Sequence, residues 1–358
     1  MKMLKKFELG VIEGFYGAPW SWDIRKEYIK FLKKSGYSFY FYAPKADAFF
    51  RRKWREEMPM ELVNNLKELS QVCKDEGIAF GVGFSPYEIY LSFDDDAKTF
   101  LLARINLFNE IGVDRLAILF DDMKNAPGLA KNQADILHWI KERSRCSQLL
   151  MCPTYYSLDP VLDRIFGERP PDYLTDLGRH LDSSIGLFWT GEEVCSKGYT
   201  LEHIRWINSL VGRKVALWDN YPVNDGPKMC KFLHLKAFTE RPATLSNEIS
   251  SHFVNPMNQS WLSKIPILTL RDSYDLKEKY SPEASFKNAV SNLSNDDLAN
   301  RMFADLEKFQ VSGLDNLTPE IRKYLISIYA QFQHPLTTEI IDWLNDKYTV
   351  TRELFLTQ

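Results

Sequence analysis

The sequence lacks the features that would direct it to a nucleic acid or a membrane. It has 45 Lys and Arg against 48 Asp and Glu, a net charge of −3, so its charge predicts neither a nucleic-acid partner nor an anionic lipid surface. No apolar run is long enough to span a bilayer, and the start MKMLKKFELGVIEGFYG has no continuous apolar stretch of the length that a signal peptide needs. We therefore expect a cytoplasmic protein without a membrane partner.

The sequence also lacks the spacings of metal and phosphate sites. None of the five cysteines, at positions 73, 146, 152, 195 and 230, forms a CxxC pair, which argues against zinc and against a disulfide framework and favours a reducing compartment. The six histidines have no metal-ligand spacing, and no glycine-rich loop could cradle a phosphate. We expect no metal site.

What the chain does have is the run LAILFDDM, residues 116–123, in which five apolar residues lead to the adjacent acids Asp121 and Asp122. An apolar run of this length is typical of a strand buried on both faces, and the switch to charge marks its end. Two carboxylates there are candidates for paired acid and base chemistry. The alternative interpretation is that Asp122 caps the following helix and Asp121 is an exposed loop acid.

Strand-like runs recur along the chain with amphipathic helical segments such as 23–36 and 94–112 between them. Alternation of this kind implies parallel strands, and eight units over about 250 residues fit a (β/α)8 TIM barrel. A doubly wound open sheet is the second choice. The eight predicted strands lie at 9–13, 37–42, 79–85, 115–120, 148–152, 185–189, 214–218 and 250–254.

In such a barrel the reactive groups lie at the carboxyl ends of the strands. The strands here end in a lysine, carboxylates, amides and aromatic residues, a composition that suits a carbohydrate, because hydroxyls need polar partners and an indole can cover the apolar face of a sugar ring. Lys45, Asp121, Asn220 and Asn255 each follow a predicted strand, and Trp218 ends one.

Several of these segments resemble glycoside hydrolase family 84, the O-GlcNAcase and β-N-acetylglucosaminidase family formerly described as hyaluronidases. The resemblance covers about residues 8–290, including YSPEASF after the barrel. Within the barrel the matching motifs occur in the family's order: GVIEGFYG, YAPK, FDDM, CPTYY, FWTG, WDNYPVND and VNPM.

The resemblance implies a (β/α)8 barrel that hydrolyses terminal β-linked N-acetylglucosamine with retention, without a cofactor, the substrate's own acetamide oxygen acting as the nucleophile. It implies that Asp121 orients the acetamide and that Asp122 is the general acid and then the general base. Its implied substrate-binding residues are Gly14, Lys45, Cys152, Tyr156, Thr190, Val194, Trp218, Asn220, Asp225 and Asn255. The implied partner is a GlcNAc-bearing glycoside, glycan or glycoprotein.

Three residues depart from the family pattern, and each bears on the side of the leaving group. Glu192 stands where proline is usual, Tyr155 where many members have glutamate, and Tyr87 where glycine is common. Two other functions stay open: hyaluronidase-like cleavage of an N-acetylhexosamine polysaccharide, and a catalytically silent barrel that binds a sugar. The natural leaving group, whether a protein serine or threonine, a peptidoglycan fragment or a glycan, is not determined by the sequence.

After about residue 270 the pattern changes to helices alone. Ser281-Pro282-Glu283 and Thr318-Pro319-Glu320 each have the form of a helix start, and 294–309 and 337–346 are further amphipathic segments. We predict a catalytic barrel over 1–270 and a small helical C-terminal domain over 271–358. These helices either pack on the barrel or pair with a second subunit, so a homo-oligomer stays open.

Overall fold

The computed structural model describes residues 7–350 and contains a closed barrel of parallel strands. Neighbours in sequence are neighbours in the barrel, with Val82 beside Leu116 and Ile118 beside Met151. This confirms the predicted (β/α)8 barrel and excludes the open sheet. The strands are β1 (Glu8–Glu13), β2 (Phe39–Tyr42), β3 (Ala79–Phe84), β4 (Arg115–Leu119), β5 (Gln148–Cys152), β6 (Gly186–Trp189), β7 (Ala216–Asp219) and β8 (Ser251–Val254).

The chain divides into two compact units, which we describe separately. The first contains the chain up to Gly14 together with 22–220 and 244–253. The second contains 15–21, 221–243 and the chain from Val254 onward. The charged start, on which the prediction of no signal peptide partly depends, includes residues 1–6, which lie outside the described residues.

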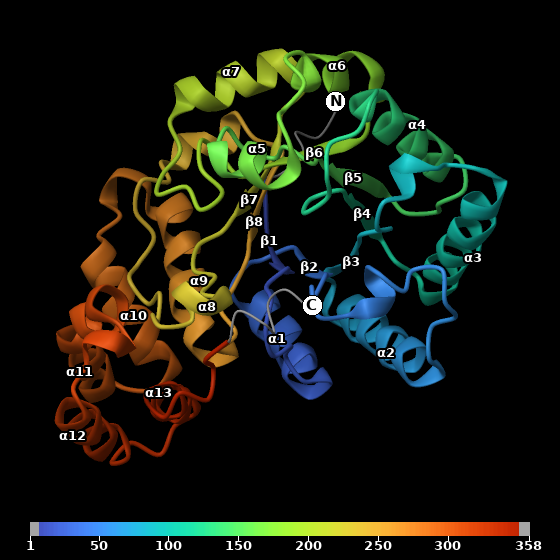
Figure 1. Ribbon diagram of the computed structural model, residues 1–358. Helices are drawn as coiled ribbons and strands as arrows, with labels where there is room; N and C mark the ends of the chain where they lie inside the picture. Colours follow the sequence, from blue (N-terminus) through green and yellow to red (C-terminus); the bar gives the residue numbers. More distant parts are fainter. Residues whose placement is uncertain (1–6, 351–358) are drawn as a thin grey trace. The chain divides into compact units, whose positions relative to one another are not determined.

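The helices of the first unit follow the strands as predicted (Figure 1). Residues at their ends explain their limits: the Asp94 side chain accepts a hydrogen bond from Ala97 N at 2.8 Å, and Gly112 ends the same helix with a φ of 80°. The helices are α1 (Trp22–Lys34), α2 (Met60–Glu76), α3 (Asp95–Ile111), α4 (Leu129–Lys141), α5 (Pro160–Phe166), α6 (Tyr173–His180) and α7 (Leu201–Val211).

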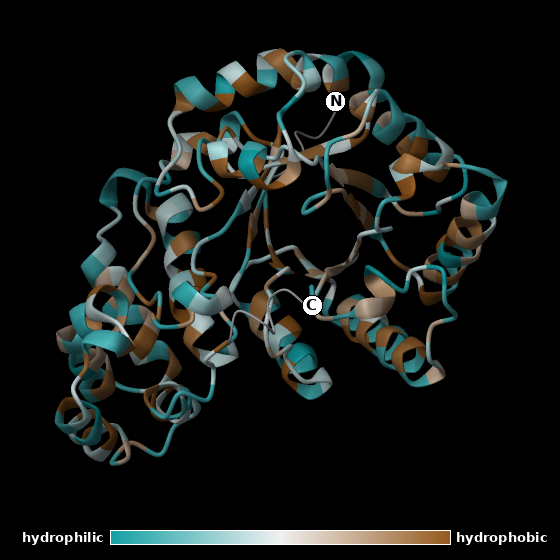
Figure 2. Ribbon diagram, in the orientation of Figure 1, coloured by the Kyte–Doolittle hydropathy of each residue, from teal (hydrophilic) through white to brown (hydrophobic). Residues whose placement is uncertain are grey.

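The barrel interior is aromatic at its centre. The Phe253 ring lies 4.3 Å from that of Phe39 and 4.6 Å from that of Phe188. Gly10 makes room for these rings, since a Cβ there would lie 1.9 Å from the Phe39 ring. Figure 2 shows the hydrophobic colour on the strands and on one side of several surrounding helices. This packing fixes the strands whose ends carry the candidate site.

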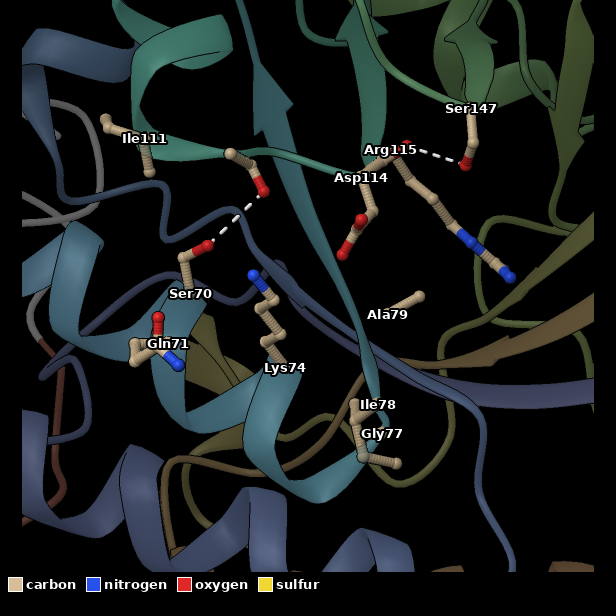
Figure 3. A pocket seen from close by; sticks show the side chains of 11 residues that line it. Ser70, Gln71, Lys74, Gly77, Ile78, Ala79, Ile111, Asp114, Arg115 and Ser147 are labelled. Atoms are coloured by element: carbon tan, nitrogen blue, oxygen red, sulfur yellow. Dashed lines mark hydrogen bonds between the residues drawn. The ribbon is translucent and has the colours of Figure 1, made fainter.

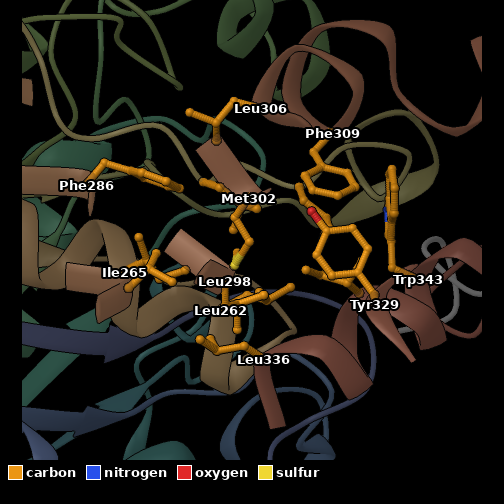
Figure 4. Close-up of a cluster of buried hydrophobic side chains, with 14 of the residues drawn as sticks. Leu262, Ile265, Phe286, Leu298, Met302, Leu306, Phe309, Tyr329, Leu336 and Trp343 are labelled. Atoms are coloured by element: carbon orange, nitrogen blue, oxygen red, sulfur yellow. The ribbon is translucent and has the colours of Figure 1, made fainter. Parts of the chain in front are cut away.

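The second unit is helical and has its own hydrophobic core, shown in Figure 4, in which Phe309 packs on Tyr329 and Trp343. Ser281, Asn295 and Thr318 each cap a helix through a side-chain oxygen. In the part of the chain that the structure describes, no helix is long and apolar enough to cross a membrane. The helices are α8 (Gly226–Met229), α9 (Ser260–Leu276), α10 (Pro282–Leu293), α11 (Asp296–Glu307), α12 (Pro319–Tyr329) and α13 (Pro335–Leu344).

Candidate active site

The two acids follow β4 directly and lie in different environments. Phe120 extends the hydrogen bonding between β4 and β5, since its backbone N donates to Cys152 O at 2.9 Å. The chain then turns. The Asp121 side chain is 10% exposed and that of Asp122 is 26% exposed. Asp122 has a φ of 59°, in the left-handed region that few side chains adopt, so adjacent residues present their carboxylates differently.

Asp121 is paired with Lys45, which follows β2. The Lys45 ammonium donates to Asp121 Oδ2, and both side chains are buried. The contact with the ammonium fixes the orientation of the Asp121 carboxylate. Its other oxygen, Oδ1, is buried without a hydrogen-bond partner among the described residues. Asp121 can therefore accept one further hydrogen bond, as the acetamide role requires.

The cation that faces Asp122 is Arg51, and it lies farther from the Asp122 carboxylate than Lys45 lies from the Asp121 carboxylate. Arg51 Nη2 lies 3.8 Å from Asp122 Oδ2 and 3.5 Å from its backbone oxygen. The helix-capping alternative is wrong, because α4 begins only at Leu129 with Gly128 in the N-cap position. The two acids thus differ in exposure, in backbone conformation and in the distance to their cation.

The ends of β5, β6 and β7 are joined by hydrogen bonds that involve five predicted site residues. Thr190 N donates to Tyr156 O at 2.9 Å. The Asn220 amide donates to Val194 O at 2.9 Å and accepts from Trp218 Nε1 at 3.0 Å. The structure therefore brings Tyr156, Thr190, Val194, Trp218 and Asn220 together as one bonded rim.

Cys152 and Gly14 fit this rim for reasons of space and charge. Cys152 is buried, and burial raises the pKa of its thiol. The charges of Asp121 and Asp122 raise this pKa further, and the charge of Lys45 lowers it. A neutral buried thiol agrees with its predicted role in shaping a pocket, not with a nucleophile. At Gly14 a Cβ would lie 2.5 Å from the Trp218 ring, so only glycine lets the chain pass there.

Behind Lys45 lies a buried polar network that sequence reasoning missed. Arg25 on α1 donates two hydrogen bonds to Glu13 at the end of β1, at 2.8 and 2.7 Å, and the Tyr40 hydroxyl donates to the same carboxylate. Tyr42 donates to Asp47 at 2.7 Å, in the loop that carries Lys45. The only available signal was a polar residue at a strand end, which does not identify a partner 12 residues away.

Asp225 and Asn255, the other two predicted substrate ligands, belong to the second unit. Asp225 Oδ2 accepts from Tyr16 N at 2.8 Å, and the Asn258 amide donates to Tyr16 O at 3.0 Å. Segment 15–21 and the chain after β7 and β8 are thus bonded within that unit. Asn258 matched a glycosylation sequon in the sequence, yet it is buried and bonded inside the protein.

A hollow of about 520 Å³ lies at the other ends of the strands (Figure 3). Ala79 and Arg115, which begin β3 and β4, line it, and its two serines donate to backbone oxygens of Gly112 and Asp114 at 3.3 and 2.9 Å. The reactive groups of parallel barrels gather at the carboxyl ends. We therefore place the candidate site at Asp121 and Asp122. Among the described residues no group of three or more His, Cys, Asp or Glu side chains could hold a metal ion.

A TIM barrel with two acids at the carboxyl end of a strand and a rim of amide, hydroxyl and indole groups is typical of glycoside hydrolases. The chain belongs to the β-N-acetylglucosaminidase family, whose family model matches residues 9–309. This confirms the resemblance noted in the sequence.

The relatives agree with this assignment. The chain is 29% identical over 281 residues to the protein O-GlcNAcases of Mus musculus and Rattus norvegicus, a match that covers 75% of this chain and 30% of each relative. It therefore spans about a third of the length of the curated relatives it matches.

Two solved structures are similar over almost the whole chain. A mutant O-GlcNAc hydrolase of Thermobaculum terrenum superposes with a TM-score of 0.80 at 29% identity, covering 95% of this chain and 81% of that one. The structure of CpGH84B superposes with a TM-score of 0.75 at 26% identity, covering 94% of this chain and 66% of that one.

Proposed function

We propose that this protein is a retaining β-N-acetylglucosaminidase that removes terminal β-linked GlcNAc with the help of the substrate's 2-acetamido group. The observation that carries the proposal is the unequal pairing of the two acids. Lys45 contacts Asp121 directly, whereas Arg51 lies 3.8 Å from the Asp122 carboxylate. A carboxylate in direct contact with a cation suits a fixed hydrogen-bond acceptor, and the more exposed carboxyl group of Asp122 suits contact with the leaving group and with water.

In the first step Asp121 accepts a hydrogen bond from the acetamide N–H through its open oxygen, Oδ1. This raises the electron density on the acetamide oxygen, which attacks the anomeric carbon. Asp122 gives its proton to the departing oxygen as the bond from that oxygen to the anomeric carbon breaks, and an oxazolinium ion forms whose N–H stays hydrogen-bonded to Asp121. In the second step Asp122, now a carboxylate, takes a proton from water as the water attacks the anomeric carbon and opens the oxazolinium ring. Two inversions at one carbon give net retention.

The remaining predicted residues bind and enclose the sugar in this proposal. Lys45, Asn220, Asp225, Asn255 and the backbone oxygen of Gly14 bind its hydroxyls or its acetamide. Cys152, Tyr156, Thr190, Val194 and Trp218 shape the space for the N-acetyl group. The hydrogen bonds that join the strand ends support this role, since a rigid rim holds a ligand at little entropic cost.

We also propose that the substrate is a GlcNAc-bearing glycan or glycoprotein in the cytoplasm, and that the chain has a catalytic barrel over 1–270 and a helical domain over 271–358. The buried free thiols of Cys73, Cys152 and Cys230 support a reducing compartment.

The activity is tested by comparing an aryl β-N-acetylglucosaminide with the matching β-glucoside. The first should be cleaved with the β anomer as the initial product in proton NMR, and the second should be almost inert because it lacks the nucleophile. An initial α anomer, or similar rates on both, would remove the proposed mechanism.

A panel of natural leaving groups separates the other two candidates. Release of GlcNAc from protein or small glycosides supports the proposal, and internal cleavage of an N-acetylhexosamine polysaccharide would favour the hyaluronidase-like alternative. Tight binding of GlcNAc without turnover of any substrate would identify a silent sugar-binding barrel.

A further inference from the structure

One loop brings a cation to each of the two acids. The chain from Ala43 to Arg51 leaves β2 and passes through the short helix η1 (Ala48–Phe50). Lys45, near its start, contacts Asp121, and Arg51, at its end, faces Asp122. The family motif identified Lys45 alone, so the role of Arg51 is a separate question.

Arg51 is not a solvated surface arginine. Its side chain is only 8% exposed, although it begins the charged run RRKWREE. The preceding residue is fixed from two sides: Ser85 N donates to Phe50 O at 2.9 Å, and the Phe50 ring lies 5.1 Å from that of Tyr42. A buried guanidinium that is attached to a rigid backbone segment is held in a single position.

The loop itself is braced by Asp47. Its carboxylate accepts from Phe49 N at 3.0 Å, which caps η1, and from the Tyr42 hydroxyl at 2.7 Å. Further along the chain, Arg104 on α3 donates to Trp54 O at 3.0 Å. The position of Arg51 is therefore set by the fold before any substrate binds.

The contact between Arg51 and Asp122 is directed at the backbone. Nη2 reaches the Asp122 backbone oxygen at 3.5 Å and lies 3.8 Å from the carboxylate, and the backbone there is in the left-handed conformation. Such a conformation persists only when its surroundings hold it. The contact with Arg51 therefore aims Asp122 through its backbone.

We propose that Arg51 is a positioning residue that acts through Asp122 by holding its backbone in place. The inference rests on the proposed function. It assigns a different task to each end of the loop after β2: Lys45 contacts Asp121, and Arg51 keeps Asp122 aimed.

The test compares Arg51→Gln, Arg51→Lys and the matched control Arg52→Gln. Arg52 is the next residue and is exposed, with its guanidinium 4.9 Å from the Tyr87 ring. The kcat and KM of each variant are measured on GlcNAc glycosides with good phenol and with poor alkyl leaving groups. Thermal unfolding of each variant reports on folding.

For Arg51→Gln we expect kcat on poor leaving groups to fall by about ten- to a hundredfold, with KM and the rates on good leaving groups little changed, because a misaimed acid matters most when protonation is needed. Arg51→Lys should restore part of the rate on poor leaving groups. Arg52→Gln should behave as the wild type.

The inference is overturned if Arg51→Gln keeps the wild-type activity or loses activity equally on all leaving groups, or if Arg52→Gln has the same effect. If Arg51→Gln does not fold, Arg51→Lys decides: a loss confined to poor leaving groups supports the inference, and an equal loss on both contradicts it. If the wild type cleaves no β-N-acetylglucosaminide, the proposed function fails and this inference fails with it.

Discussion

At the scale of single residues, Asp121 and Asp122 are neighbours in the chain but differ in the cation that each meets. Asp121 is in contact with the Lys45 ammonium and keeps one oxygen open. Asp122 is more exposed and stands 3.8 Å from Arg51. These differences lead to separate kinetic expectations for the two acids, which mutagenesis can test one at a time.

Replacement of Asp122 by alanine should reveal a general acid. Protonation of the departing oxygen matters little when the leaving group is already good, so Asp122→Ala should lose most of its activity on alkyl or protein glycosides and much less on aryl glycosides of acidic phenols. Added azide should accelerate the second step of this variant, because azide attacks the oxazoline without needing a general base. Steady-state rates across a series of phenols, with and without azide, measure both effects.

Replacement of Asp121 by alanine should act on all substrates alike. The acetamide must be oriented whatever group departs, so Asp121→Ala should slow both substrate types by similar factors, on the order of a hundredfold. The two roles would be exchanged if Asp121→Ala showed the leaving-group dependence and Asp122→Ala did not.

The sequence identified the two acids but not all of their partners. The apolar run before Asp121 and Asp122 was enough to place them at the end of a buried strand. The sequence placed Lys45 at the end of a predicted strand, but only the family motif gave it a binding role, because a lone lysine is usually solvated. Arg51 was missed because a charged run such as RRKWREE normally marks an exposed face, and only the fold buries its first arginine.

At the scale of elements, the Glu13–Arg25 pair joins β1 to α1 beneath the candidate site. Both side chains are almost completely buried, and the guanidinium also lies 4.5 Å from the Trp22 ring. Removal of one partner leaves a buried charge without a counter-charge, which strongly lowers the free energy of unfolding.

Arg25→Met should therefore lower the free energy of unfolding by about 3–5 kcal/mol in urea denaturation. Lys30→Met on the same helix is the control: it breaks the exposed pair with Glu27 and should change the free energy of unfolding little. A similar small cost for both variants would show that the buried network does not stabilise the barrel.

Glu339 on α13 caps the first turn of α9, the helix that follows β8 and Asn255. Its carboxyl group accepts from Trp261 N at 3.1 Å and from Leu262 N at 2.9 Å. Burial raises its pKa from 4.5 to about 7. A raised pKa means that the folded state prefers the protonated acid, so the stabilising contribution is complete below about pH 4.5 and is lost as the pH rises towards 7.

Glu339→Gln keeps the acceptor oxygen but cannot ionise. Relative to this variant, the wild type should lose stability between pH 4.5 and 7, by at most about 1.4 kcal/mol for each pH unit. Urea denaturation of both proteins at several pH values measures the difference. If the two curves stay parallel across this range, Glu339 does not titrate there.

The strands and helices themselves could be predicted well because their signals are local. All eight predicted strands are present, with ends that differ from the structure by up to two residues. Capping residues such as Asp94 and Ser281 identified helix starts for the same reason, since one side chain satisfies one backbone N–H nearby in the chain.

At the scale of the whole molecule, the alternation of strands and helices predicted the barrel. It did not predict which segments of the chain make up the second unit. That unit takes in 15–21 and 221–243 as well as the C-terminal helices. The bonds from Tyr16 to Asp225 and to Asn258 span more than 200 residues of sequence. Contacts at such separations leave no periodic trace in the sequence, so Asp225 and Asn255 could be proposed as ligands only through the family motifs.

The central claim is that the acetamide oxygen of the substrate is the nucleophile. In this account Asp121 orients the acetamide, and Asp122 is the general acid and then the general base. The most direct measurement is kcat/KM for aryl glycosides in which the N-acetyl methyl group carries zero, one, two or three fluorines. Each fluorine withdraws electron density from the acetamide oxygen, so the account predicts that kcat/KM falls at every step, by well over tenfold across the series, which corresponds to more than about 1.4 kcal/mol in the barrier. A rate that stays constant across the series would contradict it.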